Sequence, residues 1–292
     1  MVAASLLSPG ALVGVAFAFG LVVGSFLNVV IHRLPRGESI VRPGSRCPGC
    51  GHPIAAWENV PVLSYLWLRG RCRGCGAAIS PRYPLVELLT GGVFALLIAV
   101  QGVSWMTPLW LVFAAALIAV AAIDFDHRLI PDEISLGGLA VGLIAVPALR
   151  SLEGAPYLGA LFASGLGALL GGGLLWTVGF AHARVSTALG RSFDHWPGEG
   201  EELPRPSDLD YWVWFPGLGF GDVKLLAMIG AFAGPLGVVE TILAAALVGL
   251  LLGLGWVALE RNWSSPFGFA PAIAIGAIGV LISPVHLLAI LP

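Results

Sequence analysis

Long apolar runs recur along the whole chain, and several approach the about 20 residues that an α-helix needs to cross a bilayer. Of the 292 residues, 57 % are hydrophobic and 11 % are charged, whereas soluble domains are about 45–50 % apolar. This pattern predicts an all-α polytopic membrane protein with about eight transmembrane helices, and disfavours a soluble protein with buried helices. The expected spans are 9–31, 85–102, 106–124, 134–149, 157–181, 219–233, 236–259 and 267–290.

The positive charges predict the orientation, because Lys and Arg in short loops stay on the cytoplasmic side. With both termini outside, 14 of the 15 Lys and Arg residues lie in inner segments or, for Lys224, at an inner helix end, and only Arg150 lies outside. The inner segments are 32–84, 125–133, 182–218 and 260–266. The first span has no basic residue before it and no clear cleavage site after it, which indicates a retained anchor and not a signal peptide.

Three regions follow from these spans. Residues 1–33 form the first transmembrane helix, 34–84 a cytoplasmic domain with all four cysteines, and 85–292 the remaining transmembrane core. Within the core, 182–218 is expected to be a flexible or partly ordered loop, and the glycine-rich run 165–173 predicts close helix packing in lipid. The net charge of −2 indicates no particular partner, and we find no nucleic-acid motif.

The four cysteines form two Cys-x-x-Cys pairs separated by 21 residues. This spacing is typical of a tetrahedral zinc site, whereas disulfides would need an oxidising compartment and this loop is expected in the cytoplasm. Four thiolates leave no open coordination position, so the zinc is expected to be structural and to fold the loop. His52 is either a competing ligand or a surface residue. The predicted ligands are Cys47, Cys50, Cys72 and Cys75.

Two acidic motifs are expected at the same membrane face. Asp124 and Asp126 end the third span, and Asp222, 98 positions after Asp124, begins the sixth. When two carboxylates meet at a partly dry site, one keeps its proton. The ionised carboxylate then takes a proton from an attacking water while the protonated one polarises the peptide carbonyl. Asp124 and Asp222 are therefore candidates for aspartyl protease chemistry, beside the alternatives given below.

The residues around Asp222 have more than one interpretation. Gly219 and Gly221 remove side chains beside the acid, which lets a substrate backbone approach. Lys224 either contacts lipid phosphate or another acid, or is a helix-end anchor.

The acids also have a capping interpretation, in which Asp222, Asp132 or Glu133 caps a helix. Salt bridges and proton coupling in a transporter are further alternatives. A transporter would usually place its acids at the bilayer midplane.

Six ordered sequence blocks resemble the type IV prepilin leader peptidases, bifunctional membrane enzymes that also methylate their product. The resemblance covers nearly the whole chain. The blocks are residues 24–35 (GSFLNVVIHRLP), the paired Cys-x-x-Cys motifs, 81–87 (PRYPLVE), 124–132 (DFDHRLIPD), 219–224 (GFGDVK) and 266–271 (PFGFAP).

The resemblance implies cleavage of the basic leader of prepilins and pseudopilins after a Gly at the bacterial inner membrane, followed by N-methylation from S-adenosylmethionine. It implies that Asp124, seven residues before Pro131, and Asp222 are catalytic, and that Asp126 tunes the pair or binds Arg128. Methyl transfer rests on the resemblance alone, and a leader peptidase without it is the alternative. The methyltransferase candidates are Glu38, Glu58, Asn59, Arg82 and Glu87.

The segment 182–218 is longer and more acidic than the resemblance suggests. Its acids either steer a basic leader peptide toward the site or belong to a solvated spacer. These acids are Glu199, Glu201, Glu202, Asp208 and Asp210.

Overall fold

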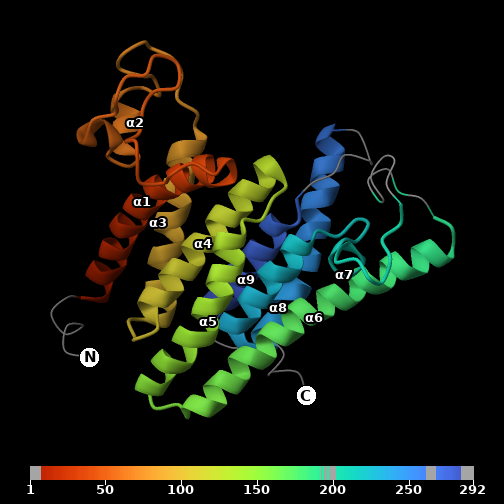
Figure 1. Cartoon of the computed structure of the whole chain (residues 1–292). Coiled ribbons are helices and arrows are strands. Elements are labelled where there is room, and N and C mark those ends of the chain that lie inside the picture. Colours follow the sequence, from red (N-terminus) through yellow and green to blue (C-terminus); the bar gives the residue numbers. More distant parts are fainter. Residues whose placement is uncertain (1–7, 192, 194–195, 197–201, 261–267, 284–292) are drawn as a thin grey trace. The chain divides into compact units, whose positions relative to one another are not determined.

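The computed structural model describes residues 8–191, 193, 196, 202–260 and 268–283, and the regular elements in this part of the chain are helices (Figure 1). Six of the helices are long and apolar enough to cross a membrane. The helices are α1 (Pro9–Arg33), η2 (Leu34–Arg36), η3 (Ala56–Asn59), α2 (Leu63–Trp67), α3 (Arg82–Gln101), α4 (Thr107–His127), α5 (Asp132–Leu152), α6 (Tyr157–Ala188), α7 (Asp210–Val213), α8 (Phe220–Glu260) and α9 (Ala270–Ile282).

The helix boundaries follow recognisable signals. Ser8 caps α1 by accepting a hydrogen bond from the Ala11 N–H at 3.3 Å, and Pro9 is its first residue, where the missing N–H does no harm. Helix α4 ends where Arg128 takes the left-handed conformation, and Pro131 then precedes α5. These positions agree with the expected spans to within a few residues.

Helix α8 joins two of the expected spans. It is 41 residues long, about twice the length that one bilayer crossing needs. Its backbone leaves the helical conformation at Gly234 (φ 73°, ψ −176°), next to Pro235, which is where the sequence analysis separates the two spans. The number of crossings, predicted as eight, stays a prediction.

The chain divides into two compact units, and α9 contributes residues to both. In the first unit α1, α3 and α4 pack together. The contact of α1 with α3 depends on small residues, because a Cβ added to Gly20 would lie 2.7 Å from the Gly91 Cα, and one added to Gly24 would lie 2.6 Å from the Glu87 Cα. Close backbone approach of this kind is typical of helices packed in lipid.

In the second unit α5, α6 and α8 pack on one another. A Cβ on Gly167 would lie 2.1 Å from the Gly230 carbonyl oxygen, and one on Gly171 would lie 2.2 Å from that of Leu226. The glycine-rich run 165–173 therefore packs closely against α8, which confirms the prediction made for it.

Helix α6 extends to Ala188, beyond the expected end at residue 181, so the connecting segment is shorter than 182–218. Aromatic contacts with α7 explain the longer helix. The Arg184 guanidinium lies 3.7 Å from the ring centre of Tyr211, and the Trp176 indole N–H donates to the Trp212 carbonyl at 2.8 Å. Part of the expected loop is thus ordered by packing on α6.

Candidate active site and metal centre

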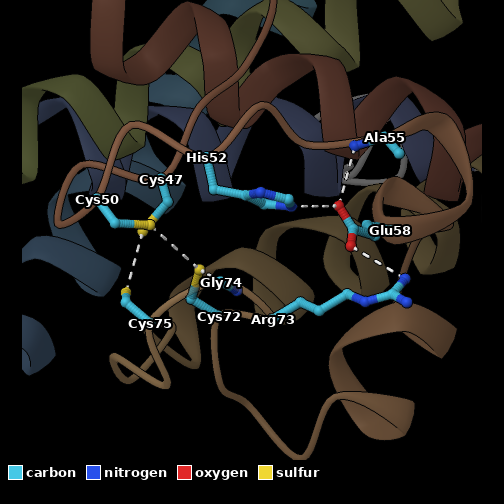
Figure 2. Close-up of polar contacts among 9 residues, drawn as sticks. All are labelled: Cys47, Cys50, His52, Ala55, Glu58, Cys72, Arg73, Gly74 and Cys75. Carbon is cyan, nitrogen blue, oxygen red and sulfur yellow. Dashed lines mark hydrogen bonds and ion pairs between the residues drawn. The ribbon is translucent and has the colours of Figure 1, made fainter.

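The four cysteines lie together between α1 and α3 (Figure 2). All four Sγ atoms are within 4.8 Å of one another, with 3.9 Å from Cys47 to Cys75 and 4.0 Å from Cys50 to Cys72. Four sulfurs around a tetrahedral zinc, at about 2.3 Å each, are about 3.8 Å apart. The donor set and its spacing therefore fit a zinc ion.

Each Cys-x-x-Cys pair forms the same turn. The Gly51 N–H donates to the Cys47 carbonyl and the Gly76 N–H to the Cys72 carbonyl, both at 2.8 Å. Gly51 and Gly76 have φ of +72° and +73°, a conformation that glycine adopts without steric cost. The local sequence therefore builds the two halves of the site independently.

The thiols influence one another strongly. Backbone N–H groups of Gly49 and Cys50 lower the pKa of Cys47 to about 7. The backbone at His52 also favours the Cys50 thiolate, but the Cys75 thiol and burial outweigh it and raise the pKa of Cys50 to about 12. Four thiolates at neutral pH thus need a cation between them, which is what a bound metal supplies.

Glu58 makes several polar contacts within this cysteine-rich segment (Figure 2). Its side chain is 4 % exposed and lies 3.2 Å from His52 Nε2 and 3.6 Å from Arg73 Nη1. The Ala55 N–H, the largest cause, and then His52 and Arg73 lower the pKa of Glu58. His52 thus contacts Glu58, and the described cluster with metal-ligand spacing consists of the four cysteines.

Glu87, in α3, connects this segment to the helices. Its carboxylate is buried and accepts a hydrogen bond from the Val62 N–H at 2.7 Å. Val62 has φ of 61°, a conformation that is strained for a β-branched residue. Glu87 therefore holds the turn before α2. The two other candidates in this region, Glu38 and Asn59, are exposed.

Arg82, the first residue of α3, contacts the end of α4. Its guanidinium forms an ion pair with Asp126 and donates to the Ala122 carbonyl at 3.0 Å. Asp126 is thus bound by Arg82, a partner that the sequence analysis did not predict, since 44 positions separate them.

Asp124 lies in the last turn of α4 and is only 5 % exposed. One carboxylate oxygen, Oδ2, accepts a hydrogen bond from the Ala270 N–H at 3.0 Å. Ala270 is the first residue of α9, so a segment 146 positions away orients this side chain. The sequence analysis gave residues 266–271 only as a block of the family resemblance and predicted no contact with Asp124.

Asp222 lies in the first turn of α8. Its N–H donates to the Gly219 carbonyl at 3.1 Å, and a Cβ on Gly219 would lie 3.6 Å from Asp222 Oδ2. A Cβ on Gly221 would lie 3.1 Å from the Cβ of Ile130. Gly219 therefore leaves space beside the acid, whereas Gly221 allows α8 to pack on residue 130.

Lys224 forms an ion pair with Asp132 at the start of α5. This contact agrees with the interpretation of Lys224 as a partner of another acid. Asp132 does not cap α5, because Pro131 occupies the N-cap position.

Asp124 belongs to the first unit and Asp222 to the second. The pairing of the two carboxylates stays a prediction.

Family models match most of the chain. The Bacterial Peptidase A24 N-terminal domain matches residues 18–101, and the Type IV leader peptidase family matches residues 111–254. The first match covers the four cysteines, and the second covers both acidic motifs.

Curated relatives are similar over nearly their full length. A protein of Aeromonas salmonicida is 37 % identical over 290 residues, 89 % of this chain and 86 % of the relative. Proteins of Stutzerimonas stutzeri and Pseudomonas aeruginosa are each 36 % identical and cover 92 % and 91 % of this chain and 89 % of their own lengths. All three are named prepilin leader peptidase/N-methyltransferase. No solved structure matches the chain.

Proposed function

The chain belongs to the type IV leader peptidase family, and from this we propose that it removes the basic leader from prepilins and pseudopilins after a Gly and then N-methylates the new amino terminus. The observation that carries the proposal is the shared bifunctional name of relatives that are 36–37 % identical over about nine tenths of this chain.

In the proposed cleavage step Asp124 and Asp222 share one proton. The ionised carboxylate takes a proton from water as the water oxygen attacks the carbonyl carbon of that Gly, and the protonated carboxylate donates its proton to the carbonyl oxygen. As the C–N bond breaks, the proton held by the first acid passes to the leaving amine. Support for the pairing comes from the charge pattern, which predicts the ends of both acidic spans at the same membrane face.

In the second step the new terminal amine attacks the methyl carbon of S-adenosylmethionine, the bond from this carbon to sulfur breaks and S-adenosylhomocysteine leaves, and the methylated amine gives a proton to water. The candidates for this step fall into two groups. Three of them already bind other groups of the protein: Glu58, Arg82 and Glu87. The other two, Glu38 and Asn59, are exposed and therefore accessible to a substrate. Zinc held by the four cysteines would stabilise the fold of the segment that carries these candidates.

We further propose the bacterial inner membrane, both termini outside and the site facing the cytoplasm. The charge pattern supports this orientation, because it leaves only Arg150 outside. The proposed domains are 1–33, the zinc-binding 34–84 and the peptidase core 85–292.

The test uses the purified chain in lipid nanodiscs with a full-length pilin precursor and S-adenosylmethionine labelled in the methyl group. Leader loss and label incorporation are followed together for wild type, Asp124→Ala, Asp222→Ala and Cys72→Ser. We expect wild type to show both reactions and the two Asp variants to show neither on the precursor. Cleavage by either folded Asp variant at the wild-type rate would contradict the pairing, and cleavage without label would leave a leader peptidase alone.

A further inference from the structure

The segment just before α9 lies directly against the Asp124 carboxylate. Gly268 has no side chain, and a Cβ built on it would lie 2.1 Å from Asp124 Oδ2, 2.6 Å from its Cγ and 2.9 Å from its backbone oxygen. Two residues later the Ala270 N–H donates to the same Oδ2 at 3.0 Å. Backbone atoms of 268–270 thus contact Asp124 from two positions.

Glycine is needed at position 268 because no space is left there for a side chain. Glycines with a left-handed φ include Gly217 and Gly234, but Gly268 is not among them, so the backbone there is open to alanine. The obstacle is Asp124 itself. Because the close atoms include the backbone oxygen of α4, the Asp124 side chain cannot simply rotate away from an added methyl group.

The Ala270 N–H is well suited to hold a carboxylate. The first N–H groups of a helix have no partner within the helix, and the helix dipole favours negative charge at this end. Asp124 is only 5 % exposed, so water competes little for its oxygens. The bond therefore restricts where the carboxylate points.

We propose that the Gly268–Ala270 segment is the positioning element for Asp124: the bare backbone at 268 admits the carboxylate and the amide of 270 fixes its orientation for attack. This inference rests on the proposed function in that Asp124 is taken as a catalytic acid. It assigns Gly268 to the chemical step and not to substrate binding or to the zinc site.

The decisive variant is Gly268→Ala, and Gly279→Ala is its control. Gly279 lies in α9, the helix that follows Gly268, and a Cβ there has no atom within 4 Å. We expect Gly268→Ala to lower kcat for leader cleavage about 100-fold, since displacing a reacting group by about 1 Å costs this much, with KM within about 3-fold. Zinc content and methyl transfer to an already cleaved pilin should match wild type. Gly279→Ala should match wild type throughout.

A thermal double-mutant cycle keeps the proposal testable if Gly268→Ala is poorly folded. Asp124→Ala removes the carboxylate that the new methyl group meets. Gly268→Ala should therefore lower Tm by several degrees in the wild-type background and by less than half as much in the Asp124→Ala background. Additive losses of Tm would show that residue 268 does not act on Asp124.

The outcomes separate this inference from the proposed function. If Asp124→Ala cleaves at the wild-type rate, the proposed function fails and the positioning role fails with it. If Asp124→Ala is inactive but Gly268→Ala has wild-type kcat, the positioning role alone is wrong. A rise in KM with unchanged kcat would overturn it too, because it would place Gly268 in substrate binding.

Discussion

The two proposed catalytic acids are each followed, two positions later, by a charged residue that ties the helix to a neighbour. After Asp124, the acid Asp126 in α4 is bound by Arg82 of α3. After Asp222, the base Lys224 in α8 binds Asp132 of α5. The neighbouring charge is negative in α4 and positive in α8, but in both cases it connects the helix of the proposed catalytic acid to another helix.

The two ion pairs differ in their contacts with the neighbouring helix. Arg82 contacts both the Asp126 carboxylate and the Ala122 carbonyl, whereas Lys224 binds an Asp132 side chain that is 59 % exposed. Exposed ion pairs contribute about 0–1 kcal/mol to stability. We therefore expect both ion pairs to affect the position of the helix ends more than the stability of the fold.

The largest expected effect is on the rate of leader cleavage, which should fall far more when a proposed catalytic acid is replaced than when its charged neighbour is replaced. Asp124→Asn and Asp222→Asn should lower the rate of leader cleavage by about 10³-fold or more, because an amide cannot take or give the proton. Asp126→Asn should cost no more than about 10-fold. A gel assay of leader loss measures this, and an Asp126→Asn variant as inactive as Asp124→Asn would overturn the assignment of roles within α4.

Replacing a cysteine tests whether the cysteine-rich segment serves methyl transfer more than leader cleavage. Cys72→Ser leaves a three-thiolate site, so we expect loss of bound zinc in metal analysis and a fall of methyl transfer by at least about 10-fold. Cleavage should fall less, since neither acidic motif is touched. Zinc retained at the wild-type level would exclude Cys72 as a ligand.

Neutralising the two bases compares the ion pairs directly. We expect Arg82→Gln to lower cleavage about 10-fold and Lys224→Gln about 3-fold, because Arg82 makes two contacts and an Arg cannot be replaced at such a site without loss. Arg205→Gln is the control, since its pair with Glu202 is 74 % and 86 % exposed. A larger loss for Lys224→Gln than for Arg82→Gln would reverse the comparison.

The smallest effect concerns Glu58, which is distant in sequence from both acidic motifs. Its lowered pKa means that it stabilises the fold above the unfolded value, about 4.3, and that this contribution disappears as the pH falls through the folded value. The Tm difference between wild type and Glu58→Gln should be constant from pH 7 to about pH 5 and shrink at lower pH. Thermal scans in nanodiscs measure it, and a difference that grows on acidification would contradict the sign.

The sequence predicted those features that depend on local spacing. The four cysteines are such a case, because each Cys-x-x-Cys turn with its glycine brings two sulfurs together by itself. The helical spans and the close packing of 165–173 are others. Long apolar runs and glycine spacing determine them with little help from the rest of the chain.

Other features depend on which distant segments meet, and one sequence does not show that. Arg82 is a candidate for methyl transfer, but its contact with Asp126 was not predicted, and the contact of Lys224 with Asp132 is one of several that the sequence allowed. Helix α6 continues past residue 181 because Arg184 stacks on Tyr211 of α7. Each partner lies many positions away, so no periodicity signals it.

The hydrogen bond from Val62 to Glu87 has a consequence for exchanging parts between related proteins. The domain predicted from the sequence ends at residue 84. The carboxylate that accepts the hydrogen bond from its strained residue Val62 belongs to Glu87, which lies beyond this boundary in α3. The domain is therefore not a self-contained module. A chimera that exchanges residues 34–84 inherits whatever its host carries at 87, and we expect only hosts with a carboxylate there to accept the graft.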